Sequence, residues 1–239
     1  MPRFTNRDVV KSYEAKFTTE DVSKDDLILR VDLKWCGPDL DVCAFMLDEE
    51  GGLAKKVDAV YFKSNTYRWK TAASFDSQDF DPLDGEPSEW EKVKEEYGGR
   101  LKYWMSKTLP ASPDFSVIGS WDDTGDDEGE EESGETIHVR IEEINTIKYK
   151  RIVFAAVVAA DEIEDGKTFG DVSEAIVSIA DVDTPEEPIV TYSLNEKFPQ
   201  KDAVCFGQLI WNEEDKYWTF EGMEEGHKGG FLELANNVF

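Results

Sequence analysis

The segment from Asp122 to Glu135, DDTGDDEGEEESGE, holds nine carboxylates among fourteen residues, with three glycines and no basic residue. A second acidic pair, Asp39 and Asp41, opens an apolar run far upstream. Carboxylates this dense repel one another unless water, a basic partner or a hard cation neutralises them. Because glycines let the backbone bend, several oxygens could face one point, as calcium requires. A divalent-cation site is one hypothesis, and a solvated acidic loop is the alternative.

Two separate segments are expected to supply the ligands of such a site, because calcium takes about six to eight oxygens and one loop rarely provides them all. On an extended strand the side chains of Asp39 and Asp41 share one face, since one residue separates them. The acidic segment adds carboxylates around Gly125 and at the mouth of the next strand-like run. The candidate ligands are Asp39, Asp41, Asp122, Asp123, Asp126 and Glu135.

Other metal and catalytic chemistries have less support in the sequence. An EF-hand is excluded, because the sixth position counted from Asp122 is Asp127 instead of glycine and the twelfth is Ser133 instead of glutamate. The histidines, His138 and His227, belong to no zinc-binding pattern. No phosphate-binding glycine loop or nucleophile elbow occurs. We therefore expect that the protein is not an enzyme.

The overall charge narrows the class of partner. The chain has 239 residues, with 53 Asp and Glu against 26 Lys and Arg, a formal net charge of −27 and a pI near 4.3. This balance argues against binding to nucleic acid or to anionic membrane surfaces, which require clustered basic residues. No run approaches about 18 apolar residues, and the N-terminus lacks the apolar stretch of a secretory signal. The three widely spaced cysteines are typical of free thiols, so a cytoplasmic location is expected.

Apolar and polar residues alternate along much of the chain, which predicts β-strands. Eight or nine short strands are expected within the runs 27–35, 42–47, 57–62, 136–144, 149–160, 174–182, 188–194, 203–211 and 216–223. The run at 149–160 is continuously apolar and is predicted to be buried on both faces. Turn-forming clusters separate the runs, with little helix between them. The pattern predicts a mostly β fold, an antiparallel sandwich of two sheets with a short C-terminal helix at 229–239.

Two regions depart from this rhythm. Residues 1–26 are polar and are expected to form an N-terminal arm or short helix before the domain at 27–239. The interval 70–116 is predicted to be a helical insertion, because its apolar residues recur near i, i+3, i+4 spacing. This apolar stripe is expected to pack on the sandwich, and the alternative is a surface for a partner protein. The candidate anchors of that surface are Trp90, Tyr97 and Trp104.

Several segments together carry a family resemblance. They are DLDVCAFMLDEEG, DAVYF, KRIVFAA, KTFGDVSEA, YSL, FGQLIW and the closing KYWTF…GHKGGFLEL. In order and spacing they resemble the TerD family of tellurium-resistance and stress-response proteins over residues 28–66 and 117–235. The resemblance implies a β-sandwich of two sheets, a cytoplasmic stress context, and a Ca²⁺ site for one or two ions. That site would be built from the D-L-D segment and a Gly/Asp-rich loop.

Carried over to this chain, the D-L-D motif falls on Asp39 and Asp41, and the terminal acid of the loop falls on Glu135. Thr124 and Gly125 match the T-G of the acidic loop. The chain departs from the family pattern at four places. Gly37 stands where many members have Asp, Cys43 replaces a small hydroxyl residue, Lys63 replaces an Asn, and the loop is longer with Ser120 where Asp is expected.

These observations lead to two functional hypotheses. The first is a calcium-binding stress-response protein that serves as a scaffold for other proteins of a tellurite- or stress-resistance system. The second is a metal-independent, acidic protein-interaction module in which the ammonium group of Lys63 neutralises the former metal site. The two differ in their response to chelators, which only the first predicts.

Overall fold

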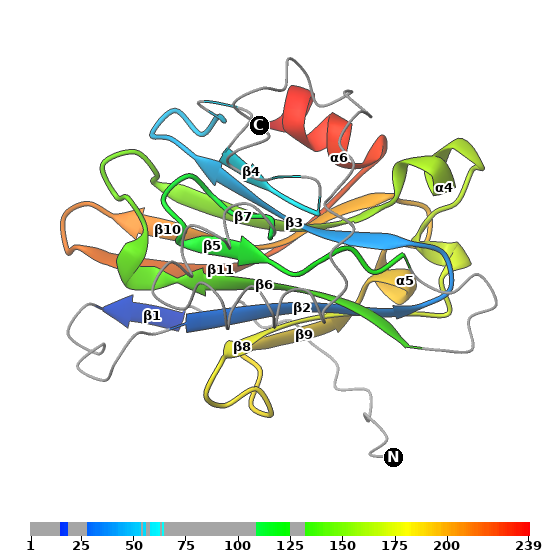
Figure 1. Cartoon of the computed structure of the whole chain (residues 1–239), viewed down its shortest axis with the longest axis horizontal. Coiled ribbons are helices and arrows are strands. Elements are labelled where there is room, and N and C mark those ends of the chain that lie inside the picture. The colour runs from blue at the N-terminus through cyan, green and yellow to red at the C-terminus, as the bar shows by residue number, and fades with distance from the viewer. Residues whose placement is uncertain are drawn as a thin grey trace, which may run out of the picture.

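The computed structural model describes residues 15–18, 28–53, 55, 58–62, 64, 109–124 and 132–239. Within them the chain forms a sandwich of two antiparallel sheets, so the predicted mostly β fold is confirmed (Figure 1). Most of the predicted helical insertion at 70–116 lies outside the described residues. Its candidate partner surface lies there too, with Trp90, Tyr97 and Trp104.

One sheet has six strands in the order β1-β11-β10-β7-β3-β4. Their bounds are β1 Ala15–Thr18, β11 Tyr217–His227, β10 Ala203–Asn212, β7 Arg151–Val158, β3 Leu40–Leu47 and β4 Ala59–Val60. The other sheet has five strands in the order β5-β6-β2-β8-β9. Their bounds are β5 Val117–Gly119, β6 Ser133–Arg140, β2 Ile28–Cys36, β8 Glu174–Asp181 and β9 Val190–Ser193.

All nine predicted runs contain a strand, and β1 and β5 are additions. Strand β1 lies within residues 1–26, where an arm or short helix is expected. There, residues 15–18 instead pair with β11 at the edge of the six-stranded sheet. Strand β5 has three residues and lies beside β6. Both strands are too short for a periodic pattern to be visible in the sequence.

Helices are few and short within the described residues. They are α4 (Ala160–Glu164), α5 (Leu194–Lys197), α6 (Gly230–Glu233), the 3₁₀ turns η3 (Ile141–Glu143) and η4 (Phe169–Asp171), and a π-helical turn η5 (Leu234–Val238). The predicted C-terminal helix is therefore confirmed as α6 and η5. No helix in the described ranges is long and apolar enough to cross a membrane.

The main core lies between the two sheets, and the alternation of β2 shows how the sequence builds it. Leu29, Val31, Leu33 and Trp35 point inward and are at most 1% exposed, whereas the residues between them are partly or fully exposed. Side chains from β3, β7 and β10 meet them from the six-stranded sheet. This burial is the main source of stability of a sandwich, and it fixes the register of the strands.

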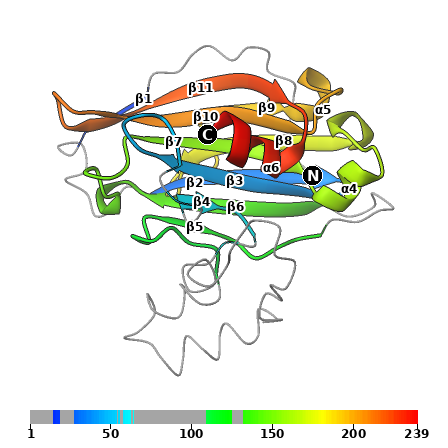
Figure 2. The same cartoon turned by 90° about the horizontal axis from the view of Figure 1, so that it is seen from above.

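A second apolar cluster covers the outer face of the six-stranded sheet. Its residues come from β3, β7 and β10, and α6 and η5 lie across them (Figure 2). Phe45 stacks on Phe231 at a centroid distance of 5.5 Å, and Tyr61 stacks on the same ring at 3.9 Å. Strand β7 is consequently buried on both faces, as its continuous apolar run predicted.

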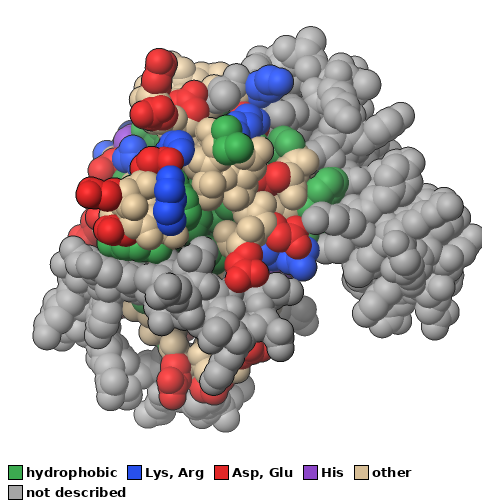
Figure 3. Space-filling view, turned by 90° about the vertical axis from the view of Figure 1, so that its left-hand side faces the viewer, with side chains coloured by type: hydrophobic (Ala, Val, Ile, Leu, Met, Phe, Trp, Pro, Cys, Tyr) green, Lys and Arg blue, Asp and Glu red, His purple; other side chains and the backbone are tan. Residues whose placement is uncertain are grey.

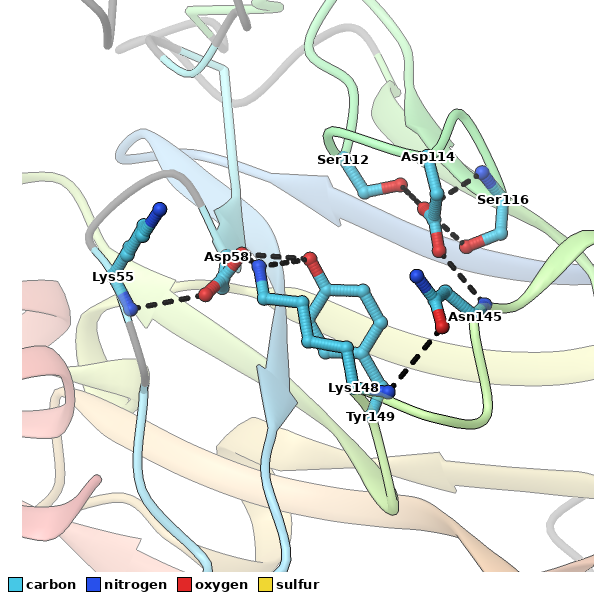
Figure 4. A network of polar contacts seen from close by, with 8 residues as sticks. All are labelled: Lys55, Asp58, Ser112, Asp114, Ser116, Asn145, Lys148 and Tyr149. Atoms are coloured by element: carbon cyan, nitrogen blue, oxygen red, sulfur yellow. Dashed lines mark hydrogen bonds and ion pairs between the residues drawn. The ribbon is translucent and has the colours of Figure 1, made fainter.

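A polar network ties three loops together at the end of the sandwich where β3 finishes (Figure 4). Its first half surrounds Asp58, whose side chain is fully buried. The Asp58 carboxylate accepts hydrogen bonds from the Lys55 amide at 2.9 Å and the Tyr149 hydroxyl at 2.7 Å, and it forms an ion pair with Lys148. These three donors satisfy the buried charge, which would otherwise be costly.

The second half of the network surrounds Asp114. Its carboxylate accepts hydrogen bonds from the hydroxyls of Ser112 at 2.6 Å and Ser116 at 2.8 Å, and from the Asn145 amide at 3.0 Å. The loop between β6 and β7 therefore holds both carboxylates, through Asn145 on one side and Lys148 on the other (Figure 4). The network fixes the chain on both sides of residues 65–108.

Charged side chains of both signs are mixed at this end of the molecule, which faces the viewer in Figure 3. In the hairpin between β10 and β11, for example, Glu213 pairs with Lys150 and with Lys216, each at 2.6 Å. These hydrogen bonds lower the pKa of Glu213 to about 2. Local neutralisation of this kind is the ordinary arrangement at a protein surface.

Candidate metal centre

Three carboxylates from both sheets meet at the opposite end of the sandwich, where β2 turns into β3. Asp41 lies on β3 of the six-stranded sheet, Glu135 lies on β6 of the five-stranded sheet, and Asp122 follows β5. One oxygen of each lies within 4.8 Å of the others. Asp41 is 4% exposed and Glu135 3%, whereas Asp122 is exposed to solvent. The fold thus brings together the two distant acidic segments.

The turn between β2 and β3 places the D-L-D motif at this rim. Gly37 has φ of +115°, a conformation that favours glycine, and this allows the chain to cross from one sheet to the other. An aspartate at this position would be strained in the same backbone conformation. After the turn, the Asp39 carbonyl accepts a hydrogen bond from the Ala159 amide at 3.0 Å. This bond holds the start of β3 against the end of β7.

Glu135 reaches the edge of β3 from the other sheet. Strand β4 pairs only with Ala44 and Phe45, so it does not extend to Val42. The Val42 amide instead donates a hydrogen bond to Glu135 Oε2 at 2.8 Å. The carboxylate of Glu135 therefore takes the place of a neighbouring strand at this point of the ladder, which fixes its position between the sheets.

The other oxygen of Glu135, Oε1, is buried and has no hydrogen-bond partner among the described residues. Burial raises the pKa of Glu135 well above its usual range. The negative charges of Asp122 and Asp39 raise it further, whereas hydrogen bonds from the backbone amides of Val42 and Asp123 act in the opposite direction. An ionised Glu135 thus needs a positive charge nearby.

Asp39 is half-buried beside the three clustered carboxylates. Its Oδ1 atom is buried without a hydrogen-bond partner among the described residues. Burial raises the pKa of Asp39 to about 7, with smaller contributions from Asp122, from Asp161 and Glu162 of α4, and from Asp123. Sequence reasoning did not include the two acids of α4, because their position depends on where β7 ends.

The base of the acidic loop is held by hydrogen bonds on both sides of residues 125–131, which lie outside the described ranges. Ser120 and Thr136 exchange two bonds, at 2.7 Å between Ser120 N and Thr136 O and at 3.0 Å between Thr136 N and Ser120 Oγ. Asp123 Oδ2 accepts a bond from the Gly134 amide at 2.8 Å. Asp123 thus secures the loop base. Asp126 falls outside the described residues.

The donor set suits a hard divalent cation. All three clustered ligand atoms are carboxylate oxygens, which calcium and magnesium prefer, and zinc would favour nitrogen or sulfur. The Cys43 thiol, two residues after Asp41 on β3, is fully buried, and burial with the charges of Asp41 and Glu135 raises its pKa well above the usual range. Lys63, the candidate replacement for a cation, lies outside the described residues.

Comparisons with known proteins bear on the family and the fold of this chain. A family model described as the TerD domain matches residues 109–238, more than half of the chain. A comparison with curated proteins gives no significant match.

Two solved structures have a similar fold. The first is a protein of unknown function, SAV2460, with a TM-score of 0.57 at 15% identity, covering 89% of this chain and 96% of that one. The second is a homologue of telluride resistance protein (TerD), SCO6318 from Streptomyces coelicolor A3(2). It has a TM-score of 0.55 at 15% identity and covers 90% of this chain and 98% of that one.

Proposed function

Since the chain belongs to the TerD family, we propose that it is a calcium-binding, non-enzymatic scaffold protein of a tellurite- or stress-resistance system. The cation would be held where the two sheets meet, by Asp41, Asp122 and Glu135 with Asp39 beside them. Other proteins of the same system would be its partners, and the cytoplasm its location. The site, the partner role and the cellular setting are parts of this one proposal.

The observation that carries the proposal is the meeting of carboxylates from two sheets around a buried oxygen. The clustered oxygens of Asp41, Asp122 and Glu135 lie within 4.8 Å of one another. Glu135 Oε1 is buried without a hydrogen-bond partner among the described residues. A buried charge of this kind is neutralised by a proton or by a cation. A divalent ion would neutralise several of the carboxylates together.

When bound, calcium supplies positive charge and accepts oxygen ligands, with carbonyls or water completing its coordination. The residues of the chain position the ligands. The amide of Val42 orients Glu135, the turn at Gly37 places the D-L-D motif, and Ser120 with Thr136 holds the loop base that carries Asp122. The expected result is a rim of fixed shape that a partner protein can recognise.

A binding role is favoured over catalysis by the chemistry of the rim. Cys43, two residues after Asp41 on β3, is buried, and its raised pKa keeps the thiol protonated. Glu135 lies against the edge of β3 and accepts a hydrogen bond from the Val42 amide. Such a rim is suited to holding an ion and shaping a surface.

A calcium titration of the metal-free full-length protein by isothermal calorimetry tests the proposal. We expect saturable binding and a higher melting temperature, with stabilisation of about 2.7 kcal/mol at a free calcium concentration of 100 times Kd. Glu135→Gln should weaken binding at least about tenfold, because a neutral amide replaces a ligand that also carries charge. Glu186→Gln, on the exposed loop after β8 at the other end of the sandwich, is the matched control.

The titration also separates the proposal from the metal-independent alternative. A protein that gives neither heat nor a thermal shift with calcium would contradict the proposed function. The alternative would gain support if the protein then bound a basic partner in a manner that depends on salt and not on chelators.

A further inference from the structure

Helix α4 begins at the same rim as the proposed cation centre. Strand β7 runs antiparallel to β3, with Val158 opposite Leu40, so β7 ends where β3 begins. The Ala159 amide bonds to the Asp39 carbonyl at 3.0 Å, and α4 starts at the next residue. Figure 1 shows α4 beside the start of β3. The first turn of this helix carries Asp161 and Glu162.

These two acids lie close enough to the centre to act on it through their charge. They follow Ala159 by two and three residues, and the amide of Ala159 is bonded to the carbonyl of Asp39. Neither Asp161 nor Glu162 forms an ion pair with a described residue, so their charges are not neutralised locally in the way that Glu213 is.

The two acids do not belong to the group that could hold an ion directly. That group consists of Asp41, Asp122 and Glu135, whose oxygens come within 4.8 Å of one another. Asp161 is exposed and Glu162 is partly exposed. Glu135 Oε1 is buried without a hydrogen-bond partner among the described residues, and this indicates where a positive charge is needed.

We propose that Asp161 and Glu162 form an outer acidic ring that strengthens divalent-cation binding through their charge, without coordinating the ion. This inference rests on the proposed function and adds residues outside the D-L-D segment and the acidic loop. A negative field at a rim raises the local cation concentration and the association rate. It also favours a doubly charged ion over a singly charged one, because the attraction scales with the charge of the ion.

The test compares the calcium affinity of the full-length protein with that of the double variant D161N/E162Q. Both substitutions keep size and remove charge. The matched control is E186Q/E187Q, which removes the same charge from the exposed loop between β8 and β9 at the other end of the sandwich. Affinity is measured by competition with a calcium-binding dye at ionic strengths of about 20 mM and about 500 mM.

The expected result is a Kd about three to ten times higher for D161N/E162Q at low ionic strength and less than about twice as high at high ionic strength. The control pair should change affinity less than about twofold at both. The metal-free melting temperature of D161N/E162Q should not fall, because the substitutions remove repulsion at the rim.

Two outcomes would overturn the inference while leaving the proposed function intact. In the first, D161N/E162Q binds calcium as the control does at low ionic strength. In the second, its affinity falls more than about a hundredfold at both ionic strengths, which would make the acids direct ligands. Failure of the unaltered chain to bind calcium is a different result, and it would contradict the proposed function itself.

Discussion

Glu135 occupies a buried position on β6, where every second side chain faces the core. Ile137 and Val139 follow it on the same face of β6, and both are fully buried. A carboxylate at this position is costly in an apolar core unless its charge is satisfied. The Val42 amide satisfies one oxygen. The other oxygen is the strongest single sign of a cation at this rim.

The pKa of Asp39 predicts how pH acts on the metal-free protein. Its pKa is raised from 3.8 to about 7, mainly by burial. Between these values the folded form keeps a proton that the unfolded form has lost, so raising the pH favours unfolding. The raised pKa of Glu135 acts in the same direction. We therefore expect the melting temperature of the metal-free protein to fall as pH rises from about 4 to about 7.

Calcium should remove this dependence. The bound ion favours the ionised carboxylates, so a saturating concentration should flatten the loss of stability between pH 5 and pH 7. Differential scanning calorimetry with and without calcium, across this pH range, measures both curves. A metal-free protein that gains stability as pH rises toward 7 would contradict the assignment of raised pKa values to the rim.

Among the elements of the candidate site, the two acidic segments were predicted from the sequence, whereas the nearby helix α4 was not. The D-L-D segment and the acidic loop were predicted to meet, and Asp41, Asp122 and Glu135 do lie together. Glu135 lies two residues before Ile137 and therefore on the same face of β6. The alternation of apolar residues along this strand thus predicts that Glu135 points inward. The α4 acids had no such signal, because their nearness to Asp39 follows from the place where β7 ends.

Short elements escaped prediction for a related physical reason. Strands β1 and β5 have four and three residues, too few for a period of two to stand out. They form because β11 and β6 offer unpaired backbone groups at the edges of their sheets. The predicted strands β4 and β9 are as short, but they lie within the longer runs 57–62 and 188–194, which made them visible in the sequence.

The Asp58 network gives a prediction at the level of elements. Asp58→Asn removes the charge that Lys148 and Tyr149 contact in a fully buried position, and loss of one partner of a buried ion pair costs about 3 kcal/mol. For a chain of this size we expect the melting temperature to fall by about 6–12 °C. Calcium affinity should be unchanged, because the network lies at the opposite end of the sandwich from Asp41. Thermal melting and calcium titration of the same variant measure the two effects.

The control for this prediction is Asp183→Asn on the exposed loop after β8, which should leave both quantities unchanged. A double variant, Asp58→Asn with Lys148→Met, should be less destabilised than the sum of the two single variants, because it leaves no unpaired charge. If the destabilisation of the double variant equals the sum for the two single variants, Asp58 and Lys148 do not act as a pair. A loss of calcium affinity in Asp58→Asn would contradict this prediction and would show that the two ends of the sandwich are energetically coupled.

The whole molecule carries a net charge of −27, which opposes the compact state. Salt screens this repulsion, so we expect the melting temperature of the metal-free protein to rise by several degrees between about 0.02 M and 0.5 M potassium chloride. Calcium should act by a different route, raising the melting temperature at micromolar to millimolar concentrations where screening is unchanged. Magnesium and potassium controls at equal ionic strength separate site binding from screening. Equal effects of calcium and potassium at equal ionic strength would refute a specific site.

A crystal structure of the full-length protein grown with calcium, with anomalous diffraction data, would show directly whether the ion binds at this rim. We expect an anomalous peak at the edge of β3, within about 2.3–2.6 Å of oxygens from Asp41, Asp122 and Glu135. A calcium-saturated crystal with no peak between those three carboxylates, or with the ion bound only elsewhere, would contradict it.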